Sequence, residues 1–573
     1  MRALIQEIHA QIKILTGIEL SAQDWAPTPN KELGDVAVPC FKLSKALGKA
    51  PPVIAQELAK SWPTSGPHSL IARVVATGPY LNVFADPEAV FAWLRTMWQK
   101  DPTRFGGSDL GTGKTLIVEF SSPNIAKEMA LHHLRSTGIG HALSNISALH
   151  GFSTVRINYL GDWGTSHGKN ILGLKLYGNE AELVEKGLPY LLDIYVRFNR
   201  AEKEDPSLSD QAKAAFAKLE EGDPESLRVW KLFRDISIRE YKKLYHRLGV
   251  HFDVFDGESM YFDKLDPVEK EINEKIGTRV SDGALVYDLP GHSVPVLLRK
   301  DDGASLYISR DLAAIQDRWN RYAFEQTWYV VDVRQALHFK QLTDTVKALE
   351  KPYAGRAEHV PFGMLLFGTK VMKTRDGNIL FLTDVLDEAK RRAAEIIREK
   401  NPALANADEV AEMVGKGAVM FADLSQHRTH DVKFDWEKAL SFEGDTSPFV
   451  QYAHARCGSL IRKGEEHLRT LPPSEDPAGV SALMQELPVR MLLSEIFSFY
   501  TSAERALADR DPSQIATTCL NIAKGMNHFY HKVRFLDESS APRLRALLDL
   551  TSFTRDVLKH GLGLLGIPAP KEM

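Results

Sequence analysis

A strand–loop–helix–strand pattern between residues 116 and 168 constrains the fold more than any other feature of this sequence. The apolar strand Leu116–Phe120 leads into a proline-containing loop and a helix that begins near Ala130. A second strand, Thr154–Leu160, ends in the glycine-punctuated loop Gly161–Gly168. Strands joined through a helix in this way run parallel, and open parallel sheets bind ligands at the carboxyl ends of their strands. The pattern therefore predicts an α/β domain whose functional loops follow these two strands.

The sequence also predicts domains on either side of this unit. With 573 residues the chain is too long for a single hydrophobic core. We expect a small α+β domain over residues 1–112, the α/β domain over residues 113–385 and an all-helical domain over residues 386–573. Charged, mainly helical sequence at about residues 171–290 is interpreted as an insertion into the α/β domain.

Four apolar segments after this insertion are expected to supply the second half of the parallel sheet. They are Val294–Arg299, Tyr307–Asp311, Trp328–Asp332 and Phe362–Phe367. A further segment, Gly106–Thr115, superficially resembles a phosphate-binding Walker loop. However, Ser108 replaces a required glycine and the segment precedes a strand, so we interpret it as a linker.

Composition limits the classes of function. The sequence has 44% hydrophobic and 25% charged residues, and no apolar run is long enough to span a bilayer. Cys40, Cys457 and Cys519 are far apart without a CxxC pair, which argues against a structural zinc site and a disulfide framework. With a formal net charge of -4, any nucleic-acid surface must be a local basic patch. We expect a cytoplasmic protein with no membrane partner and no tightly bound metal.

The segment SSPNIAKEMALHHLRSTGIG, residues 121–140, combines residues suited to a phosphate-bearing ligand. A proline-containing loop leads to the start of a helix, where unpaired N–H groups create a positive potential. Lys127 adds a mobile charge, Ser122 and Asn124 can bind a polar ligand, and His132 and His133 lie in the first turn. For Lys127, His132 or His133 alone, a capping or surface role is the better explanation, but the combination is compatible with ATP-dependent chemistry.

The same segment, with Glu119 before it, resembles the signature region of class I aminoacyl-tRNA synthetases in its arginyl-tRNA synthetase form. Other segments resemble that family in the same order along the chain. They are residues 34–52, 158–168, 301–314, 329–342, 371–389, 434–456 and the terminal GLGLLGIPAPKEM. The resemblance implies a Rossmann-like parallel-sheet catalytic domain with an insertion, a small α+β N-terminal domain that contacts the tRNA body, and an all-helical anticodon-binding domain.

The resemblance also implies roles for individual residues. Glu119, Ser122 and Asn124 match positions that contact the backbone groups of arginine, and Tyr307, Asp311 and Gln335 match those around its side chain. A guanidinium is planar and permanently charged, so a carboxylate with nearby acceptors can select it over lysine. The alternative for Asp311 is a helix N-cap in the sequence SRDLAA.

The expected catalytic residues are Lys127, His132, His133, Lys373 and Arg375, and two of their segments depart from the family pattern. The family's His-Ile-Gly-His is Ala130-Leu131-His132-His133 here, so only His133 keeps its place. We expect His132 partly to replace the lost imidazole. In the second signature, Thr374 stands at the second lysine, a loss for which Lys127 is thought to compensate.

The resemblance assigns tRNA contacts to the C-terminal region. The expected tRNA-binding residues are Gln451, Tyr452, Arg456, Lys532, Arg534 and Met573. Basic and aromatic side chains together can hold phosphates and stack on unpaired bases, although Tyr452 taken singly is as well explained by helix packing.

The implied activity is that of an arginine–tRNA ligase. It would use ATP with Mg²⁺ as a substrate complex, L-arginine and tRNA(Arg), and it would act as a monomer. The alternatives are a synthetase paralogue that uses arginine or arginyl-tRNA outside translation, and a nonenzymatic RNA-binding scaffold.

Overall fold

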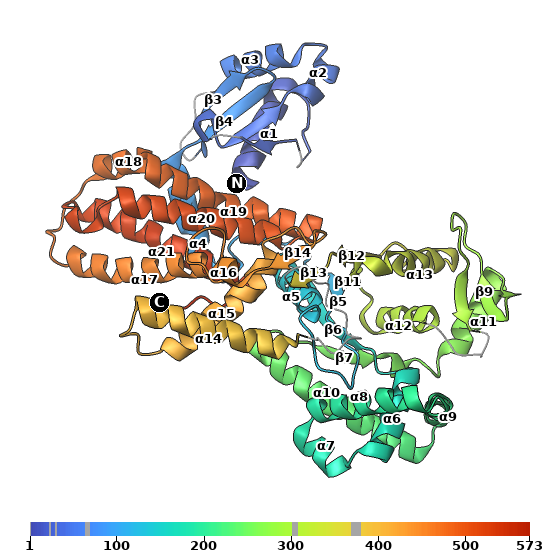
Figure 1. The fold of residues 1–573 in the computed structure, drawn as a ribbon. Coiled ribbons are helices and arrows are strands. Elements are labelled where there is room, and N and C mark those ends of the chain that lie inside the picture. The colour runs from blue at the N-terminus through green and yellow to red at the C-terminus, as the bar shows by residue number, and fades with distance from the viewer. Residues whose placement is uncertain (1, 22–23, 29–30, 64–68, 301–306, 368–379) are drawn as a thin grey trace.

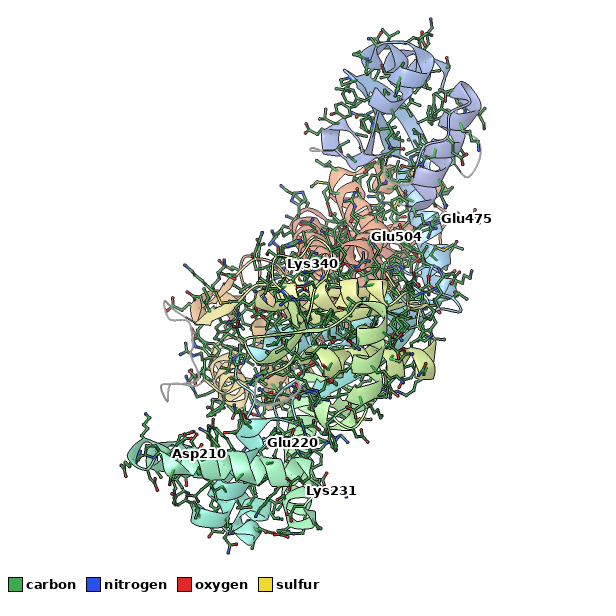
Figure 2. The ribbon with its side chains drawn as sticks, turned by 90° about the vertical axis from the view of Figure 1, so that its right-hand side faces the viewer. Asp210, Glu220, Lys231, Lys340, Glu475 and Glu504 are labelled. Atoms are coloured by element: carbon green, nitrogen blue, oxygen red, sulfur yellow. The ribbon has the colours of Figure 1, made fainter. Side chains whose placement is uncertain are left out.

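The computed structural model describes residues 2–21, 24–28, 31–63, 69–300, 307–367 and 380–573. The molecule is elongated, with the N-terminal domain at one end, a group of helices at the other and the central sheet between them (Figures 1 and 2). Within the described ranges, we find no helix with the length and apolar character needed to cross a bilayer.

The N-terminal domain is an antiparallel sheet covered by helices. Its strand order is β1-β2-β4-β3, and β3 and β4 form an antiparallel hairpin. The elements are α1 (Arg2–Thr16), β1 (Ala26–Pro27), β2 (Val36–Pro39), α2 (Phe41–Leu47), α3 (Pro51–Ser61), β3 (Ile71–Thr77) and β4 (Tyr80–Ala85).

Helix α4 (Pro87–Lys100) packs away from this domain, although residues 1–112 were expected to form one unit. It begins where the Asp86 side chain accepts a hydrogen bond from Ala89 N–H. Phe91 and Trp98 then contact Phe553, with ring centroids 5.7 and 5.2 Å apart. Since Phe553 belongs to the C-terminal helices, α4 joins the helical domain to the N-terminal sheet.

A five-stranded parallel sheet, ordered β12-β11-β5-β6-β7, forms the core of the α/β domain. Its elements are β5 (Thr115–Glu119), α5 (His133–Leu149), β6 (Ser153–Leu160), β7 (Val254–Gly257), β11 (Gln326–Asp332) and β12 (Ala357–Phe362). The chain builds outward from β5 to β7 and then returns to the other side of β5 with β11. Ligands bind at such a switch point, beyond the carboxyl ends of the strands.

Three expectations about the sheet were wrong. Val254–Gly257 was placed inside the insertion, but it pairs with β6 as an edge strand. Val294–Arg299 contributes β10 (Val296–Arg299) to a separate antiparallel sheet with β8 (Arg279–Ser281) and β9 (Ala284–Tyr287). Tyr307–Asp311 is the start of helix α12 (Tyr307–Tyr322), whose apolar residues at helical spacing pack against the sheet.

The segment Phe362–Phe367 was also expected to be a single strand of the main sheet. Instead β12 ends at Phe362, and β13 (Leu365–Phe367) pairs in parallel with β14 (Val432–Phe434). This small second sheet connects the α/β domain to the C-terminal region.

The insertion and its surroundings are mainly helical, as the sequence predicted. Helices α6 to α9 lie at the far end of the molecule, and the long α10 returns toward the sheet (Figure 1). The bounds are α6 (Thr165–Tyr177), α7 (Glu180–Lys186), α8 (Leu188–Glu204), α9 (Ser207–Glu220), α10 (Pro224–Leu248), α11 (Leu265–Lys275) and α13 (Ala336–Ala348).

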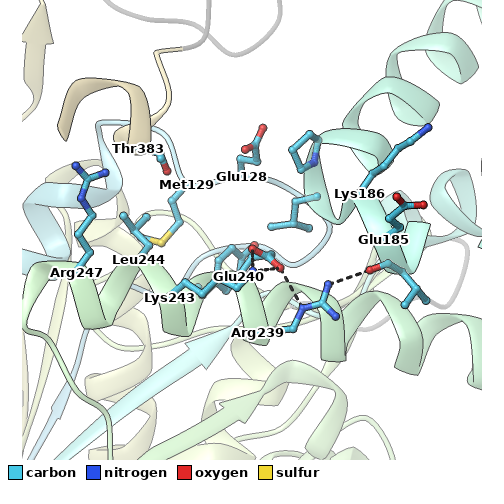
Figure 3. Close-up of a pocket in the computed structure, with 14 residues that line it drawn as sticks. Glu128, Met129, Glu185, Lys186, Arg239, Glu240, Lys243, Leu244, Arg247 and Thr383 are labelled. Atoms are coloured by element: carbon cyan, nitrogen blue, oxygen red, sulfur yellow. Dashed lines mark hydrogen bonds and ion pairs between the residues drawn. The ribbon is translucent and has the colours of Figure 1, made fainter. Parts of the chain in front are cut away.

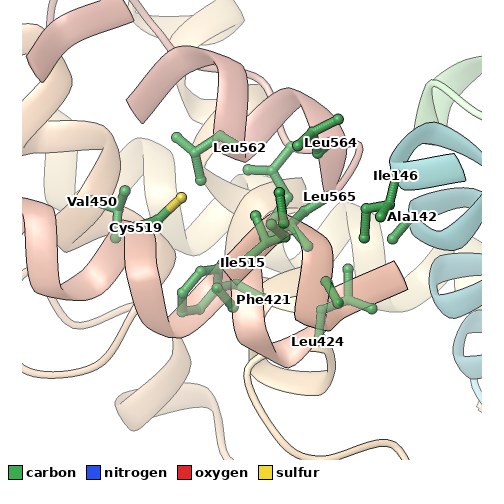
Figure 4. Close-up of a cluster of buried hydrophobic side chains, with 14 of the residues drawn as sticks. Ala142, Ile146, Phe421, Leu424, Val450, Ile515, Cys519, Leu562, Leu564 and Leu565 are labelled. Carbon is green, nitrogen blue, oxygen red and sulfur yellow. The ribbon is translucent and has the colours of Figure 1, made fainter. Parts of the chain in front are cut away.

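The C-terminal region is helical from Leu382. Its helices are α14 (Leu382–Lys400), α15 (Ala407–Leu424), α16 (Trp436–Ala439), α17 (Ser447–Leu468), α18 (Pro477–Gln485), α19 (Leu487–Asp509), α20 (Ser513–Lys532) and α21 (Ala541–Leu564). Ala142 and Ile146 of α5 join the same apolar cluster as Phe421 and Leu565, so α5 is covered by the sheet on one side and by these helices on the other (Figure 4).

Candidate active site

The loop after β5 has a strained backbone that its neighbours hold in place. Ser121, Ser122 and Ala126 all have positive φ angles, of 69°, 45° and 63°. Ser121 N–H donates to Ser136 Oγ over 2.9 Å, and Ser121 Oγ lies 2.7 Å from Tyr245 Oη. Strain of this kind persists only where the surroundings fix it, and it concentrates at functional sites.

Helix α10 supports the second half of this loop. Tyr241 Oη lies 2.7 Å from the carbonyl oxygen of Asn124 and 2.6 Å from that of Lys127, so its hydroxyl proton serves both acceptors. Ala126 N–H donates to Ser237 Oγ over 2.9 Å. The Lys127 side chain is left exposed, with Nζ 5.7 Å from the centroid of the Tyr195 ring.

The loops that follow β5 and β6 touch each other. Ile125 N–H donates to Gly161 O and Gly161 N–H donates to Pro123 O, both over 3.2 Å. A Cβ atom at position 161 would lie 2.0 Å from Asn124 Oδ1. A side chain at 161 would therefore have to displace the Asn124 side chain where the two predicted functional loops meet.

His132 and His133 stand at the N-terminus of α5, with ring centroids 4.1 Å apart. His133 is half-buried, and its Nδ1 accepts a hydrogen bond from Ala130 N–H over 3.0 Å. Burial, with the nearby positive charges of His132 and Lys127, lowers the pKa of His133 to about 3. A neutral imidazole that accepts at Nδ1 carries its proton at Nε2, so His133 is a hydrogen-bond donor toward the site.

His132 is exposed beside His133. Partial burial and the positive charge of Arg334 lower its pKa, whereas Asp332 acts in the opposite direction. His132 therefore presents a second, largely neutral imidazole at the same helix end.

The chain that follows the second signature is hydrogen-bonded to the first signature through its backbone. Leu131 N–H donates to Leu380 O, and Leu382 N–H donates to Met129 O, each over 2.9 Å. Lys373, Thr374 and Arg375 lie outside the described residues. The chain that follows them is thus anchored on the residues just before His132.

Glu119 is buried and paired with an arginine that the sequence interpretation missed. Arg318 Nη1 lies 2.6 Å from Glu119 Oε2, and both side chains are almost fully enclosed. Burial raises the pKa of Glu119 to about 7 against the opposing effect of Arg318, and the charge of Asp311 raises it further. Arg318 sits two turns after Asp311 on α12, and this helical spacing is the signal that could have indicated it.

Asp311 is in the middle of a group of buried polar residues. It lies inside α12, so the N-cap interpretation was wrong. Its negative charge raises the pKa values of Glu119, Tyr159 and Glu258, which places it near all three. His338 Nε2 approaches Asp311 Oδ2 to 2.6 Å. A partly exposed carboxylate of this kind is suited to a guanidinium.

The other residues expected to bind arginine lie at the start of α12, after β11 and after β5. Tyr307 is exposed at the start of the same helix, with the Arg310 guanidinium carbon 5.4 Å from its ring centroid. Gln335 is exposed just beyond the carboxyl end of β11. Ser122 and Asn124 lie in the loop after β5, half-buried and exposed respectively.

Glu258 is a further acidic residue that sequence reasoning missed. It follows β7 and pairs with Arg310 over 2.6 Å. Burial raises the pKa of Glu258 to about 8, although Arg310 opposes the rise, and Asp311 adds to it. The short apolar run before it was the available signal, but it was hidden within the helical insertion.

The C-terminal candidates separate into exposed and buried groups. Arg456 lies between two exposed tyrosines, 4.6 Å from the ring centroids of both Tyr452 and Tyr530. Lys532 and Arg534 are exposed nearby in sequence. Gln451 is fully buried, and its Nε2 donates to Met413 O and Pro568 O over 3.1 and 2.7 Å. In this structure Gln451 therefore fixes the C-terminal tail and offers no surface to a nucleic acid.

The C-terminal residue Met573 lies at the end of this fixed tail. Its carbonyl oxygen accepts a hydrogen bond from Asn401 Nδ2 over 3.3 Å. At the other end of the molecule, Phe41 and Tyr80 of the N-terminal domain form an exposed edge-to-face pair with centroids 6.0 Å apart. Sequence reasoning did not single out this pair because its members are 39 positions apart (80 − 41).

A charged groove of about 660 Å³ lies on the outer side of the signature segment (Figure 3). Glu128 and Met129 form one wall, and Arg239, Lys243 and Arg247 of α10 line the other. Much of this charge is internally paired, since Arg239 and Lys243 both contact Glu240. The groove does not contain the residues around Asp311.

Comparison with known proteins agrees with this geometry. The class I (R) tRNA synthetase catalytic domain matches residues 101–436, the DALR anticodon-binding domain residues 450–573, and the arginyl-tRNA synthetase N-terminal domain residues 2–85. A parallel sheet with two joined signature segments at its switch point, together with these matches, defines a class I aminoacyl-tRNA synthetase.

Relatives and solved structures give the family within that class. A Limosilactobacillus fermentum protein named arginine–tRNA ligase is 42% identical over 94% of both chains, and a Lactococcus lactis subsp. lactis protein of the same name is 38% identical over 99% of both. The Thermus thermophilus arginyl-tRNA synthetase structure superposes with a TM-score of 0.81 at 26% identity and covers 100% of both chains. The chain belongs to the arginyl-tRNA synthetase family.

Proposed function

We propose that this protein activates L-arginine with ATP and transfers the arginyl group to the 3′-terminal adenosine of tRNA(Arg). The observation that carries the proposal is that three parts lie at one sheet edge. They are the signature loop with its histidines, the chain at Leu380 that is hydrogen-bonded to it, and Asp311, whose charge acts on Glu119 at the end of β5. An enzyme of this class uses ATP as a substrate, and Mg²⁺ accompanies the triphosphate.

The first step is attack of the arginine carboxylate on the α-phosphate, which forms arginyl-adenylate and releases pyrophosphate. The α5 N-terminus, the exposed Lys127 and the neutral N–H donor of His133 stabilise the negative charge that develops on the phosphates. We assign Lys373 and Arg375 to the pyrophosphate side of the same site. Proximity and charge stabilisation supply the catalysis without a covalent enzyme intermediate.

The residues that recognise arginine come from the loop after β5, from α12 and from the segment after β11. The guanidinium binds Asp311 with Tyr307 and Gln335 around it, and Ser122 and Asn124 bind the backbone groups of the amino acid. Glu119 lies beneath this site at the end of β5, where its pair with Arg318 holds the carboxylate in place. Lysine has a compact charge without the planar donors, so it fits the same carboxylate poorly.

The tRNA contacts both ends of the molecule. Exposed Tyr452, Arg456, Lys532 and Arg534 provide stacking and phosphate contacts for the anticodon stem and loop, with Met573 at the edge of this surface. Phe41 and Tyr80 give the N-terminal domain a stacking surface for unpaired bases of the tRNA body. The proposed unit is a cytoplasmic monomer.

The test is arginine-dependent exchange of pyrophosphate into ATP, with and without tRNA(Arg), and with lysine as the control amino acid. Exchange that needs arginine and is stimulated by tRNA supports the proposal and shows that Ala130–His133 is a working signature. Arginine and tRNA binding without exchange would instead indicate a paralogue that uses arginine or arginyl-tRNA outside translation.

A further inference from the structure

Asp311 lies near the carboxylates of Glu119 and Glu258, and both of these are matched by arginines of the protein itself. Glu119 pairs with Arg318 and Glu258 with Arg310, each over 2.6 Å. A carboxylate that is already paired with a guanidinium has little charge left to attract a second one. These two therefore cannot supply the main attraction for a guanidinium ligand.

The third carboxylate, Asp311, is paired with an imidazole. His338 Nε2 lies 2.6 Å from Asp311 Oδ2, and His338 is the only hydrogen-bond partner of the Asp311 side chain within the described part of the chain. Both side chains remain partly exposed, at 23% for His338 and 19% for Asp311. Oδ1 of Asp311 is therefore available to a ligand, whereas Oδ2 is held.

The first turn of α13 holds His338 in place. Phe339 stacks on His359 with ring centroids 4.7 Å apart, and it also contacts Tyr329 of β11 at 5.0 Å. His359 Nε2 in turn lies 3.0 Å from Val331 O. His338 is thus attached to the sheet and does not move freely with the exposed surface.

We propose that His338 is a positioning residue that determines specificity for the arginine side chain. Its imidazole fixes one oxygen of Asp311 through an uncharged donor and leaves the other oxygen, with the carboxylate charge, to the guanidinium of the substrate. This inference rests on the proposed function, because it concerns the amino acid that the same site selects.

His338 differs from the arginine partners of the other carboxylates because an imidazole can lose its proton. Burial disfavours the charged imidazole, but the hydrogen bond and the charge of Asp311 outweigh this effect and raise the pKa of His338. Unlike Arg310 or Arg318, the imidazole can release its proton when a cationic ligand arrives and still donate from Nε2–H. A permanent cation at position 338 could not do so.

Three substitutions at one position separate these effects. His338→Gln keeps an uncharged N–H donor near the Nε2 position, His338→Ala removes the donor, and His338→Lys adds a permanent charge. Lys340→Ala is the matched control, since Lys340 is exposed on the same helix and, among the described residues, pairs with Asp344 and His292.

For each variant, the test measures the arginine Kd by calorimetry and the Tm. Pyrophosphate exchange in the presence of tRNA gives kcat and the KM values for arginine and ATP. The Ala variant should raise the arginine KM about tenfold and the Lys variant about a hundredfold or more, consistent with the loss of one charge-assisted hydrogen bond and the neutralisation of Asp311. The Gln and control variants should stay near wild type, and the ATP KM and Tm should not change.

Three results would overturn the inference: equal effects of Gln and Lys, an unchanged arginine KM in the Ala variant, or parallel rises in the ATP KM with a lower Tm. Because arginine binding is measured directly, the variants remain informative if wild type binds arginine but forms no adenylate. In that case the proposed function fails while the inference is still tested. Wild type that does not bind arginine would contradict both.

Discussion

At the scale of single residues, the protonation state of His133 decides how the signature works. The ring is neutral at pH 7 because its pKa is lowered to about 3, so it contributes an N–H donor and no charge. We expect His133→Ala to lower kcat for pyrophosphate exchange by about a hundredfold or more, as for other donors to a developing oxyanion, and to leave the arginine KM unchanged.

The lowered pKa of His133 predicts how the exchange rate depends on pH. A histidine with a lowered pKa is deprotonated at every pH above that value, so His133 contributes no acid limb between pH 5 and 8. Measuring the exchange rates of wild type and of the His133→Ala variant over this pH range checks that His133 is neutral. A limb near pH 6.5 that disappears in the variant would show that His133 works as a cation.

A second prediction concerns whether His132 replaces the imidazole that is missing at Ala130. Its ring lies 4.1 Å from that of His133 and is exposed, so we expect it to take over part of the role of the imidazole that Ala130 lacks. The double substitution Ala130→His with His132→Gly should leave the exchange rate within about threefold of wild type, whereas His132→Ala alone should lower it about tenfold. A rise of severalfold in the double variant would mean that His132 is a poor substitute.

At the scale of elements, the position of α5 depends on how closely it approaches β5. A Cβ atom at Gly140 would lie 2.2 Å from Phe120 Cβ and Cγ, both enclosed between helix and sheet. Gly140→Ala must therefore push α5 outward, and the His133 ring with it. We expect a loss of about 1–3 kcal/mol in the free energy of unfolding together with a lower kcat.

Gly138 provides the matched control for that prediction. It lies in the same helix two residues earlier, and its added Cβ would meet only Leu424 Cδ2 at 3.7 Å, an ordinary contact. Gly138→Ala should be neutral or stabilise the helix by up to about 1 kcal/mol. Denaturant unfolding and pyrophosphate exchange on both variants check the pair; equal effects would show that the approach to Phe120 does not position α5.

The elements also show what the sequence could predict. The local pattern was enough for β5, α5 and β6, because they form a strand–helix–strand unit with a distinct loop after each strand. It was not enough for β7, which has four residues and is recognised only through its pairing with β6. The strand predicted at Tyr307–Asp311 was wrong for a related reason, because five residues are too few to distinguish a strand from the first turn of a helix.

For the candidate site, the sequence predicted residues but not their partners. Family resemblance indicated Glu119 and Asp311, whereas Arg318 and His338, which occupy them, come from later elements brought near by folding. Gln451 illustrates the reverse case, because its polar side chain suggested a surface and the fold uses it inside. Pairing across the fold is the information that a single sequence lacks.

At the scale of the whole molecule, the C-terminal tail connects the anticodon-binding helices to the catalytic domain. His454 Nδ1 on α17 lies 2.9 Å from Pro570 O, and Asn145 Nδ2 on α5 donates to Leu564 O over 3.2 Å. A Cβ atom at Gly566 would come within 2.7 Å of the His141 ring of α5. The segment from Leu564 to the end therefore contacts both the helix that carries His133 and the helix that carries Arg456.

Deletion of residues 568–573 should test this connection. It removes the carbonyl acceptors of Gln451 and His454, and leaving buried donors without partners costs about 1–3 kcal/mol each. We expect a lower Tm, weaker tRNA binding and a loss of tRNA-stimulated exchange. The calorimetric arginine Kd should stay within about twofold, because Asp311 and His338 lie on other elements, α12 and α13.

The control for the deletion is Glu572→Ala, which removes only an exposed ion pair with Arg462 at 3.2 Å. Exposed pairs of this kind contribute about 0–1 kcal/mol, so the variant should behave as wild type in Tm and exchange. If the deletion weakened arginine binding as much as tRNA binding, the tail would be a general support of the fold. The deletion could instead weaken tRNA binding alone and leave the stimulation per bound tRNA intact. In that case the tail would hold the anticodon surface without linking it to α5, and Gly566 would contact His141 only as a packing neighbour.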